Sequence, residues 1–211
     1  MGQITVNRQS SIRISAGSTV YFDPWEVQDH AADADVIFIT HDHYDHYSAA
    51  DVRRLRKDNT VVVVPSAMVS QVNREIGGSV LAVEPGREYS VNGINFTTVA
   101  SYNLNKDFHP KGKGWCGYVV TLAGQRYYVV GDSDATQESA AVRCDVLLLP
   151  IGGHYTMDVQ EAAELTAKIK PATVIPTHYG DIVGDRSFGR AFAVLVNEKA
   201  PNTKVELLLH K

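Results

Sequence analysis

Thr40-His41-Asp42-His43-Tyr44-Asp45-His46 follows directly on an apolar run, Val36-Ile37-Phe38-Ile39. The apolar run has the length and the β-branched content of a buried strand. The polar stretch places three histidines and two aspartates in six consecutive positions. Burying so many titratable groups is costly unless a partner neutralises them, and a divalent metal is the commonest partner of mixed histidine and aspartate. The pattern predicts a metal site at a strand end, with a solvated polar loop as the alternative.

The composition is that of a globular protein. The chain has 211 residues, of which 44% are apolar, and we expect a single domain over residues 1–211. A net charge of −4 gives no general attraction to nucleic acid or to anionic membranes, so a small-molecule substrate is the expected partner. Cys116 and Cys144 lack the spacing of a metal or redox motif. No leader-like or membrane-spanning segment is recognisable, so a cytoplasmic location is expected.

Short apolar segments alternate with turn residues along the chain, and this alternation predicts an α/β fold. Capping-box spacing predicts helices beginning near Ser48 and Asp158, and apolar periodicity predicts two more through Val72 and Phe192. Strand-rich and strand-helix stretches recur in both halves, which favours two mixed sheets packed face to face with helices outside. Strands are expected over residues 20–22, 36–39, 61–64, 80–83, 94–99, 118–121, 126–130, 146–149, 173–175 and 205–209.

Polar residues stand immediately after several of these strands. Asp23, the histidine cluster, Asp132 and His178 each follow an apolar segment. Strands that run in the same sense bring their carboxyl ends to one edge of a sheet, where open α/β folds place their sites, so we expect these residues to meet. Asp23 precedes Pro24, and it either reaches the histidine cluster or serves only as an ordinary turn residue.

Within the cluster, an extended backbone directs alternate side chains to one side. This geometry predicts His41, His43 and Asp45 on one side and His46 turned toward a second position. One metal is expected to take His41 and His43, and another to take Asp45 and His46.

Two residues outside the cluster are candidates to complete this pair of sites. Asp132 is the expected carboxylate bridge between the two metals, and His178 is the expected further ligand. Two cations that share one water lower its pKa from about 16 toward neutrality, which makes hydroxide available as a nucleophile.

The motifs resemble those of the metallo-β-lactamase superfamily. His41-x-His43-x-Asp45-His46 is similar to its main motif, Gly131-Asp132 to its bridging aspartate and His178 to its last histidine. The resemblance covers roughly residues 4–209 and implies a four-layer αβ/βα sandwich. It also implies a dinuclear site, usually of Zn²⁺, with Mn²⁺ or iron as alternatives. Four segments resemble the branch that includes L-ascorbate-6-phosphate lactonase: Phe22-Asp23-Pro24-Trp25, Gly131-Asp132-Ser133-Asp134, Pro150-Ile151-Gly152-Gly153 and Pro176-Thr177-His178-Tyr179-Gly180.

One position departs from the superfamily pattern. The family places a metal-binding histidine between its main motif and the bridging aspartate, and Asn103 occupies that place in this chain. Asparagine is a weak zinc ligand. His109, six residues later, is the candidate replacement from the same loop, and an exposed loop histidine is the alternative.

Three weaker signals concern substrate. His154 lies in a glycine-flanked loop, where it either contacts substrate as a proton donor or faces solvent. Tyr179, beside His178, either polarises a substrate oxygen or packs in the core. Three lysines of one polar loop either attract an anionic substrate or only keep the loop solvated: Lys106, Lys111 and Lys113.

The function that these observations favour is a metal-dependent hydrolase. Metal-bound hydroxide is expected to cleave an ester or lactone of a small anionic metabolite, with Asp45, His154 and Tyr179 as catalytic residues. A phosphodiesterase of the same fold is the nearest alternative. An iron-loaded redox enzyme and a non-catalytic metal-binding protein also remain open, the first because histidine and aspartate also bind iron.

Overall fold

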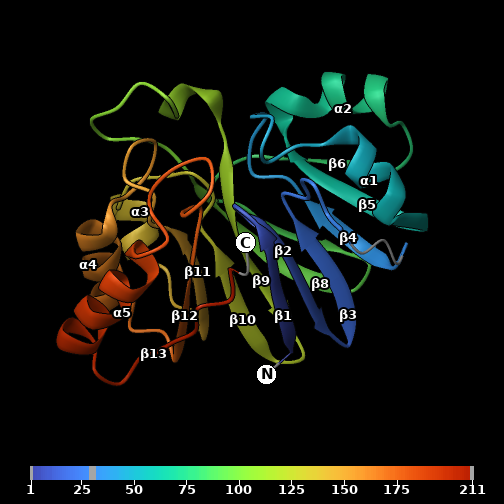
Figure 1. Ribbon diagram of the computed structural model, residues 1–211. Coiled ribbons are helices and arrows are strands. Elements are labelled where there is room, and N and C mark those ends of the chain that lie inside the picture. Colours follow the sequence, from blue (N-terminus) through green and yellow to red (C-terminus); the bar gives the residue numbers. More distant parts are fainter. Residues whose placement is uncertain (1, 29–31, 210–211) are drawn as a thin grey trace.

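Two β-sheets lie face to face in the computed structural model, which describes residues 2–28 and 32–209 (Figure 1). Each sheet is built from one continuous length of chain. The first sheet contains, in spatial order, β1 (Gln3–Arg8), β2 (Ser11–Ala16), β3 (Ser18–Phe22), β4 (Ala34–Phe38), β5 (Arg56–Pro65) and β6 (Val80–Val83). The second contains β7 (Glu88–Val91), β8 (Ile94–Ala100), β9 (Cys116–Leu122), β10 (Gln125–Val129), β11 (Val146–Pro150), β12 (Thr173–Thr177) and β13 (Lys204–Val205).

Helices cover the outer face of each sheet (Figure 1). Their apolar sides form one buried cluster against the first sheet and another against the second, while a third cluster fills the space between the sheets. The four-layer αβ/βα sandwich predicted from the sequence is therefore confirmed. The helices of the first sheet are α1 (Ala49–Leu55), α2 (Val69–Glu75) and the 3₁₀ turn η1 (Ser66–Met68). Those of the second half are α3 (Gln137–Ala140), α4 (Val159–Ile169), α5 (Phe188–Lys199) and the 3₁₀ turn η2 (Lys111–Lys113).

Aromatic rings from both sheets meet in the core beside the histidine motif. Phe38, at the end of β4, stacks on Phe22 with ring centroids 4.9 Å apart. It also meets Phe96 and Tyr118 of the second sheet, at 5.1 and 5.0 Å. The Tyr118 hydroxyl donates a hydrogen bond of 2.7 Å to the carbonyl of Ile39. Close-packed aromatic contacts of this kind hold the start of the motif in a fixed position.

The direction of the strands gathers the polar residues that follow them. β3, β4 and β5 are mutually parallel in the first sheet, as are β10, β11 and β12 in the second. Asp23 follows β3, the histidine motif follows β4, and His178 follows β12. The expectation that residues distant in sequence meet at one edge of the sandwich is confirmed by the distances given below.

The last predicted strand is wrong in extent. A strand was expected over residues 205–209, but β13 covers only Lys204–Val205. Leu209 instead forms an isolated parallel bridge with Val6 of the first sheet. The chain leaves the edge of the second sheet because Leu208 and Leu209 pack against the core between the sheets.

Within residues 2–28 and 32–209, every helix is too short or too polar to cross a bilayer.

Candidate metal centre

The histidine motif changes course after His43. The backbone N–H groups of His46 and Tyr47 both donate to the carbonyl of His43, at 3.0 Å each. This turn separates Asp45 from the two histidines with which an extended chain would align it. The predicted placement of Asp45 beside His41 and His43 is therefore wrong, and the turn carries Asp45 to a second group of side chains.

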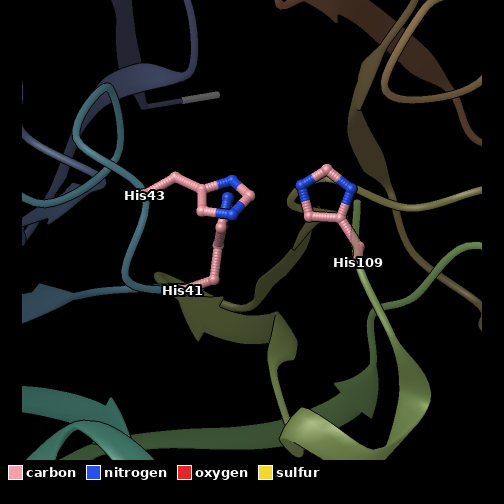
Figure 2. Close-up of side chains that lie close together, drawn as sticks. All are labelled: His41, His43 and His109. Carbon is pink, nitrogen blue, oxygen red and sulfur yellow. The ribbon is translucent and has the colours of Figure 1, made fainter. Parts of the chain in front are cut away.

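The first group comprises His41, His43 and His109, whose candidate ligand atoms lie within 4.8 Å of one another. Figure 2 shows the three rings facing a common space, two from the segment after β4 and one from the loop before β9. The His41 and His43 ring centroids lie 4.6 Å apart, and the His43 and His109 centroids lie 4.9 Å apart. His109 is only 1% exposed, so it is not the solvent-facing loop histidine that was the alternative.

The second group comprises Asp45, His46 and His178, again with candidate ligand atoms within 4.8 Å of one another. His178 Nε2 lies 3.3 Å from Asp45 Oδ2. The rings of His46 and His178 are stacked, with centroids 5.3 Å apart. The motif after β4 and the residue after β12 thus combine across the two sheets.

Asp132 stands between the two groups. Its Oδ2 atom lies 3.4 Å from His109 Nε2 and 3.2 Å from His178 Nε2. Its Oδ1 atom lies 3.4 Å from His46 Nε2. A carboxylate that contacts both histidine groups has the placement required of a bridge between two cations.

Gly131 allows Asp132 to reach this position. Its φ of +71° lies in the left-handed region, and a Cβ atom there would lie 3.0 Å from Cβ of Thr40. A side chain at this position would push the loop after β10 away from the segment after β4. Glycine is therefore favoured before Asp132, because a side chain there would clash with Thr40.

Asp23 orients two of the histidines. It is fully buried, and its Oδ2 accepts hydrogen bonds from Thr40 Oγ1 at 2.6 Å and from His46 Nδ1 at 2.8 Å. Because the Thr40 hydroxyl donates to Asp23, its oxygen accepts from His41 Nδ1 at 2.9 Å. Both rings thus carry their proton on Nδ1 and present Nε2 to the site. Of the two roles weighed for Asp23, the structure favours the one that reaches the cluster.

Asn103 orients the third histidine of the first group. Its Nδ2 donates to Asp134 Oδ1 at 3.2 Å and to the carbonyl of Tyr155 at 3.0 Å, which fixes the orientation of the amide. Its Oδ1 accepts from the backbone N–H and from Nδ1 of His109, at 3.0 Å each. His109 Nε2 is therefore the nitrogen that faces His41 and His43. Asn103 thus positions His109 within the first group.

Two site residues have strained backbones. Asp23 has φ of 46° and His178 has φ of 55°. The left-handed region costs about 1–2 kcal/mol for a non-glycine residue. The surrounding hydrogen bonds hold both residues there, from the Asp23 N–H to Phe38 and from the His178 N–H to Gln9. Strain of this kind concentrates at functional sites.

The charges of the site are strongly coupled. Burial disfavours the charged form of His46, but the Asp132 and Asp23 carboxylates outweigh burial and hold its pKa well above 6.5. Burial also opposes ionisation of Asp132, and here the neighbouring His178 and His46 hold the pKa well below its usual range. Burial, reinforced by His46, lowers the pKa of His41 well below its usual value. The buried Asp132 carboxylate and the buried His46 imidazole thus each stabilise the charged form of the other.

The donor atoms of the site fit divalent metal ions. Buried polar atoms without a hydrogen-bond partner are rare in proteins and call for an explanation. The imidazole nitrogens and carboxylate oxygens of the two groups are the donors that zinc and related metals prefer. The unpartnered atoms among them are His41 Nε2, His46 Nε2, His109 Nε2, both ring nitrogens of His178 and Asp132 Oδ1.

A cavity of about 410 Å³ opens onto this centre. At its floor are Asp45, His109, Asp132 and His178. The other lining residues are Asp42, His43, Tyr44, Phe108, Tyr155 and Ile182. Four of the lining residues were not predicted from the sequence: Tyr44, Phe108, Tyr155 and Ile182. Trp115 was not predicted either, and its buried ring lies 5.1 Å from both His41 and His43.

The remaining predicted residues lie outside the cavity lining. Tyr179 is 5% exposed and does not line the cavity. It packs closely on Gly189 of α5, where an added Cβ atom would lie only 2.5 Å from the Tyr179 hydroxyl. His154 is exposed and lies against Phe108, with centroids 5.4 Å apart. Lys106 pairs with Asp134 at 2.6 Å. The other two loop lysines contact Glu138 and the ring of Trp115: Lys111 and Lys113.

The protein has two sheets with helices outside them, and two groups of histidine and aspartate lie at the shared edge of the sheets. These features define the class of metallo-β-lactamase-fold proteins. Residues 3–178 match the family described as the beta-lactamase superfamily domain. The chain belongs to this superfamily and groups within it with the UPF0173 metal-dependent hydrolases.

Known relatives and solved structures agree with this assignment. A UPF0173 metal-dependent hydrolase of Thermoplasma acidophilum is 35% identical over 150 residues, covering 69% of this chain and 65% of the relative. A second Thermoplasma relative is likewise matched over only 66% of its length. A Pyrococcus furiosus relative is 31% identical, with 95% of this chain and 94% of the relative covered. Igni18, a metallo hydrolase of Ignicoccus hospitalis, has the same fold, with a TM-score of 0.78, 24% identity, and 97% and 93% of the two chains covered.

Proposed function

We propose that this protein is a hydrolase that uses two divalent metal ions to cleave a carboxylic ester or lactone. The observation that carries the proposal is the position of Asp132, whose two carboxylate oxygens face both histidine groups. The likeness of the chain to metal-dependent hydrolases also supports it. The specific likeness to L-ascorbate-6-phosphate lactonase stays a prediction.

In this proposal the residues divide into two ligand sets. His41, His43 and His109 hold one ion, and Asp45, His46 and His178 hold the other, with Asp132 shared between them. Two divalent cations held by these residues would lower the pKa of bound water toward neutrality and would polarise a substrate carbonyl. Zn²⁺ suits the nitrogen-rich donor set best, and Mn²⁺ and iron are the other metals that these donors accept.

Asp45 has a second proposed role. It lines the cavity as well as contacting His178. Burial opposes its ionisation, but the contact with His178 and the charge of His46 outweigh burial and lower its pKa. Asp45 is thus ionised at neutral pH and can accept a proton as the nucleophile forms. His154, next to Phe108 at the mouth, remains a candidate to protonate a leaving group.

The proposal does not extend to an anionic substrate. That expectation came from the family resemblance, with three loop lysines as a weaker signal, and two of these, Lys106 and Lys111, are paired with Asp134 and Glu138. A cytoplasmic location and the absence of a nucleic-acid partner stay predictions from the sequence.

Metal analysis combined with a substrate screen tests the function. We expect protein purified without added metal, then reconstituted with Zn²⁺, to hydrolyse members of an ester and lactone panel. A chelator or the Asp132→Ala substitution should abolish turnover, whereas Asp58→Ala, at an exposed carboxylate of β5, should not. Turnover that survives both the chelator and Asp132→Ala contradicts the proposal. Cleavage confined to phosphodiesters, or stoichiometric iron with oxygen-dependent activity, would replace it with one of the alternatives.

A further inference from the structure

Four of the residues that line the cavity present aromatic rings or an aliphatic chain, with a hydroxyl on the two tyrosines, and form what we call the apolar rim: Tyr44, Phe108, Tyr155 and Ile182. Three of them are strongly exposed, Tyr44 at 66%, Phe108 at 42% and Ile182 at 41%. Within the part of the chain that the structure describes, only six large apolar residues are exposed to this degree. Half of them therefore gather at one opening, which is the behaviour of a ligand-binding surface rather than of scattered surface residues.

Neighbouring side chains hold the rim in place. Phe108 and Tyr155 meet edge to face, with centroids 4.7 Å apart, and Tyr44 meets Trp25 at 6.0 Å. The Arg8 guanidinium lies over the Trp25 ring, 4.6 Å from its centroid. Arg8 Nη2 also donates to Asp181, the residue before Ile182, at 3.2 Å. The rim is thus preformed, which reduces the entropy lost when a ligand binds.

The charge around the rim is unfavourable for an anion. Among the described residues, no lysine or arginine lines the cavity, and Asp42 adds a carboxylate at its edge. Two cationic side chains of neighbouring segments are paired with carboxylates, Lys106 with Asp134 and Arg8 with Asp181. A carboxylate or phosphate seated on the rim would lose water and would find the Tyr44 and Tyr155 hydroxyls but no lysine or arginine there to offset its charge.

We infer that the site takes a neutral ester whose acyl group is apolar and lies on the apolar rim, while the carbonyl lies over Asp45 and Asp132 at the floor. This inference rests on the proposed hydrolase function and specifies its substrate class. The cavity volume of about 410 Å³ lies within the range of small-molecule sites. Each methylene that reaches the rim is expected to raise kcat/KM about fourfold, up to the length that fills the cavity.

A matched pair of esters tests the inference on zinc-reconstituted protein. The substrates 4-nitrophenyl hexanoate and mono-4-nitrophenyl adipate share a leaving group and differ by a terminal carboxylate. We expect the hexanoate to be preferred by at least about tenfold in kcat/KM. Equal use of both esters, or preference for the adipate, overturns the inference.

A charge-adding substitution provides the matched control. Ile182→Lys places a cation on the rim and is expected to shift the preference toward the adipate ester by about tenfold or more. Val194→Lys adds the same charge at a residue of α5 that is 59% exposed and does not line the cavity. It should leave the preference unchanged. An identical shift in both variants overturns a local role of the rim.

Binding measurements separate this inference from the proposed function. Hexanamide and adipic acid monoamide resist cleavage and differ by the same carboxylate. If neither ester is cleaved but calorimetry shows tighter binding of hexanamide, the hydrolase proposal fails and the apolar rim stands. If both esters are cleaved without preference, the hydrolase proposal stands and the inference fails. If there is neither cleavage nor preferential binding, both fail.

Discussion

Asn103 Oδ1 accepts two hydrogen bonds from His109, one from its backbone N–H and one from its ring Nδ1. Asn103 thus orients a histidine that faces the site. Removing an orienting partner of a metal ligand typically weakens metal binding by about 10–100-fold. We expect Asn103→Ala to lower the affinity of the first group for Zn²⁺ by this factor, as measured by competition with a chromophoric chelator.

Asn105→Ala is the matched control for that substitution, because Asn105 is an exposed residue of the same loop. It should leave zinc affinity unchanged. Undiminished affinity and stoichiometry in Asn103→Ala would show that His109 needs no orienting partner.

Asp23 connects the two groups and should affect both. The Asp23→Asn substitution keeps the side-chain size but removes the charge that accepts from Thr40 and from His46. We expect affinity for both zinc ions to fall, each by about 10–100-fold. Isothermal titration calorimetry can resolve the two binding steps. Asp33→Asn, which acts on the separate contacts with Arg13 and Tyr21, is the control and should alter neither step.

Metal removal should destabilise the fold. The unpartnered nitrogens and Asp132 Oδ1 are buried, and bound cations would supply partners for them. A ligand present at about a thousandfold above its Kd stabilises by about 4 kcal/mol. For a protein of this size we expect Tm in scanning calorimetry to fall by roughly 10 °C on chelation. His154→Ala, at an exposed histidine outside both groups, should show the same fall. Coincident transitions with and without metal would contradict the proposed ligand sets.

Zinc binding should weaken as the pH falls. The folded pKa of His46 lies well above its ordinary value of 6.5, so the metal-free protein carries a proton there at neutral pH. That proton stabilises the metal-free fold below pH 6.5. The stabilisation is lost as the pH rises through the raised pKa. Zinc must displace the proton, so affinity should drop about tenfold per pH unit below that pKa. Chelator competition between about pH 6 and pH 8 measures the slope. A flat profile would show that His46 binds no metal.

The sequence predicted the parts of the site that strand topology positions. The motif after β4 and the residues Asp132 and His178 each follow a parallel strand, and parallel strands bring their ends together. For Tyr179 the sequence left two roles open, contact with a substrate oxygen and packing in the core. His178 adopts a positive φ, and Tyr179 packs against α5. Its position depends on that backbone conformation, which no spacing in the sequence reveals.

Loop residues were less accessible to prediction. The four members of the apolar rim come from loops separated by tens of residues, and no spacing in the sequence connects them. Asn103 was recognised only as a departure from the family pattern. Its role depends on Asp134 and the carbonyl of Tyr155, which fix the amide from two other segments. Tertiary contacts of this kind leave no local signal.

Each sheet is one unbroken length of chain, and the exposed turn between β6 and β7 is the link between them. Each proposed ligand set draws on both lengths, since His109 completes the first group and His178 the second. Cutting the chain at Gly86 would therefore leave two fragments, neither of which holds a whole ligand set. Reassociation of those fragments would be thermodynamically linked to zinc binding, so zinc would control the assembly of the two fragments reversibly.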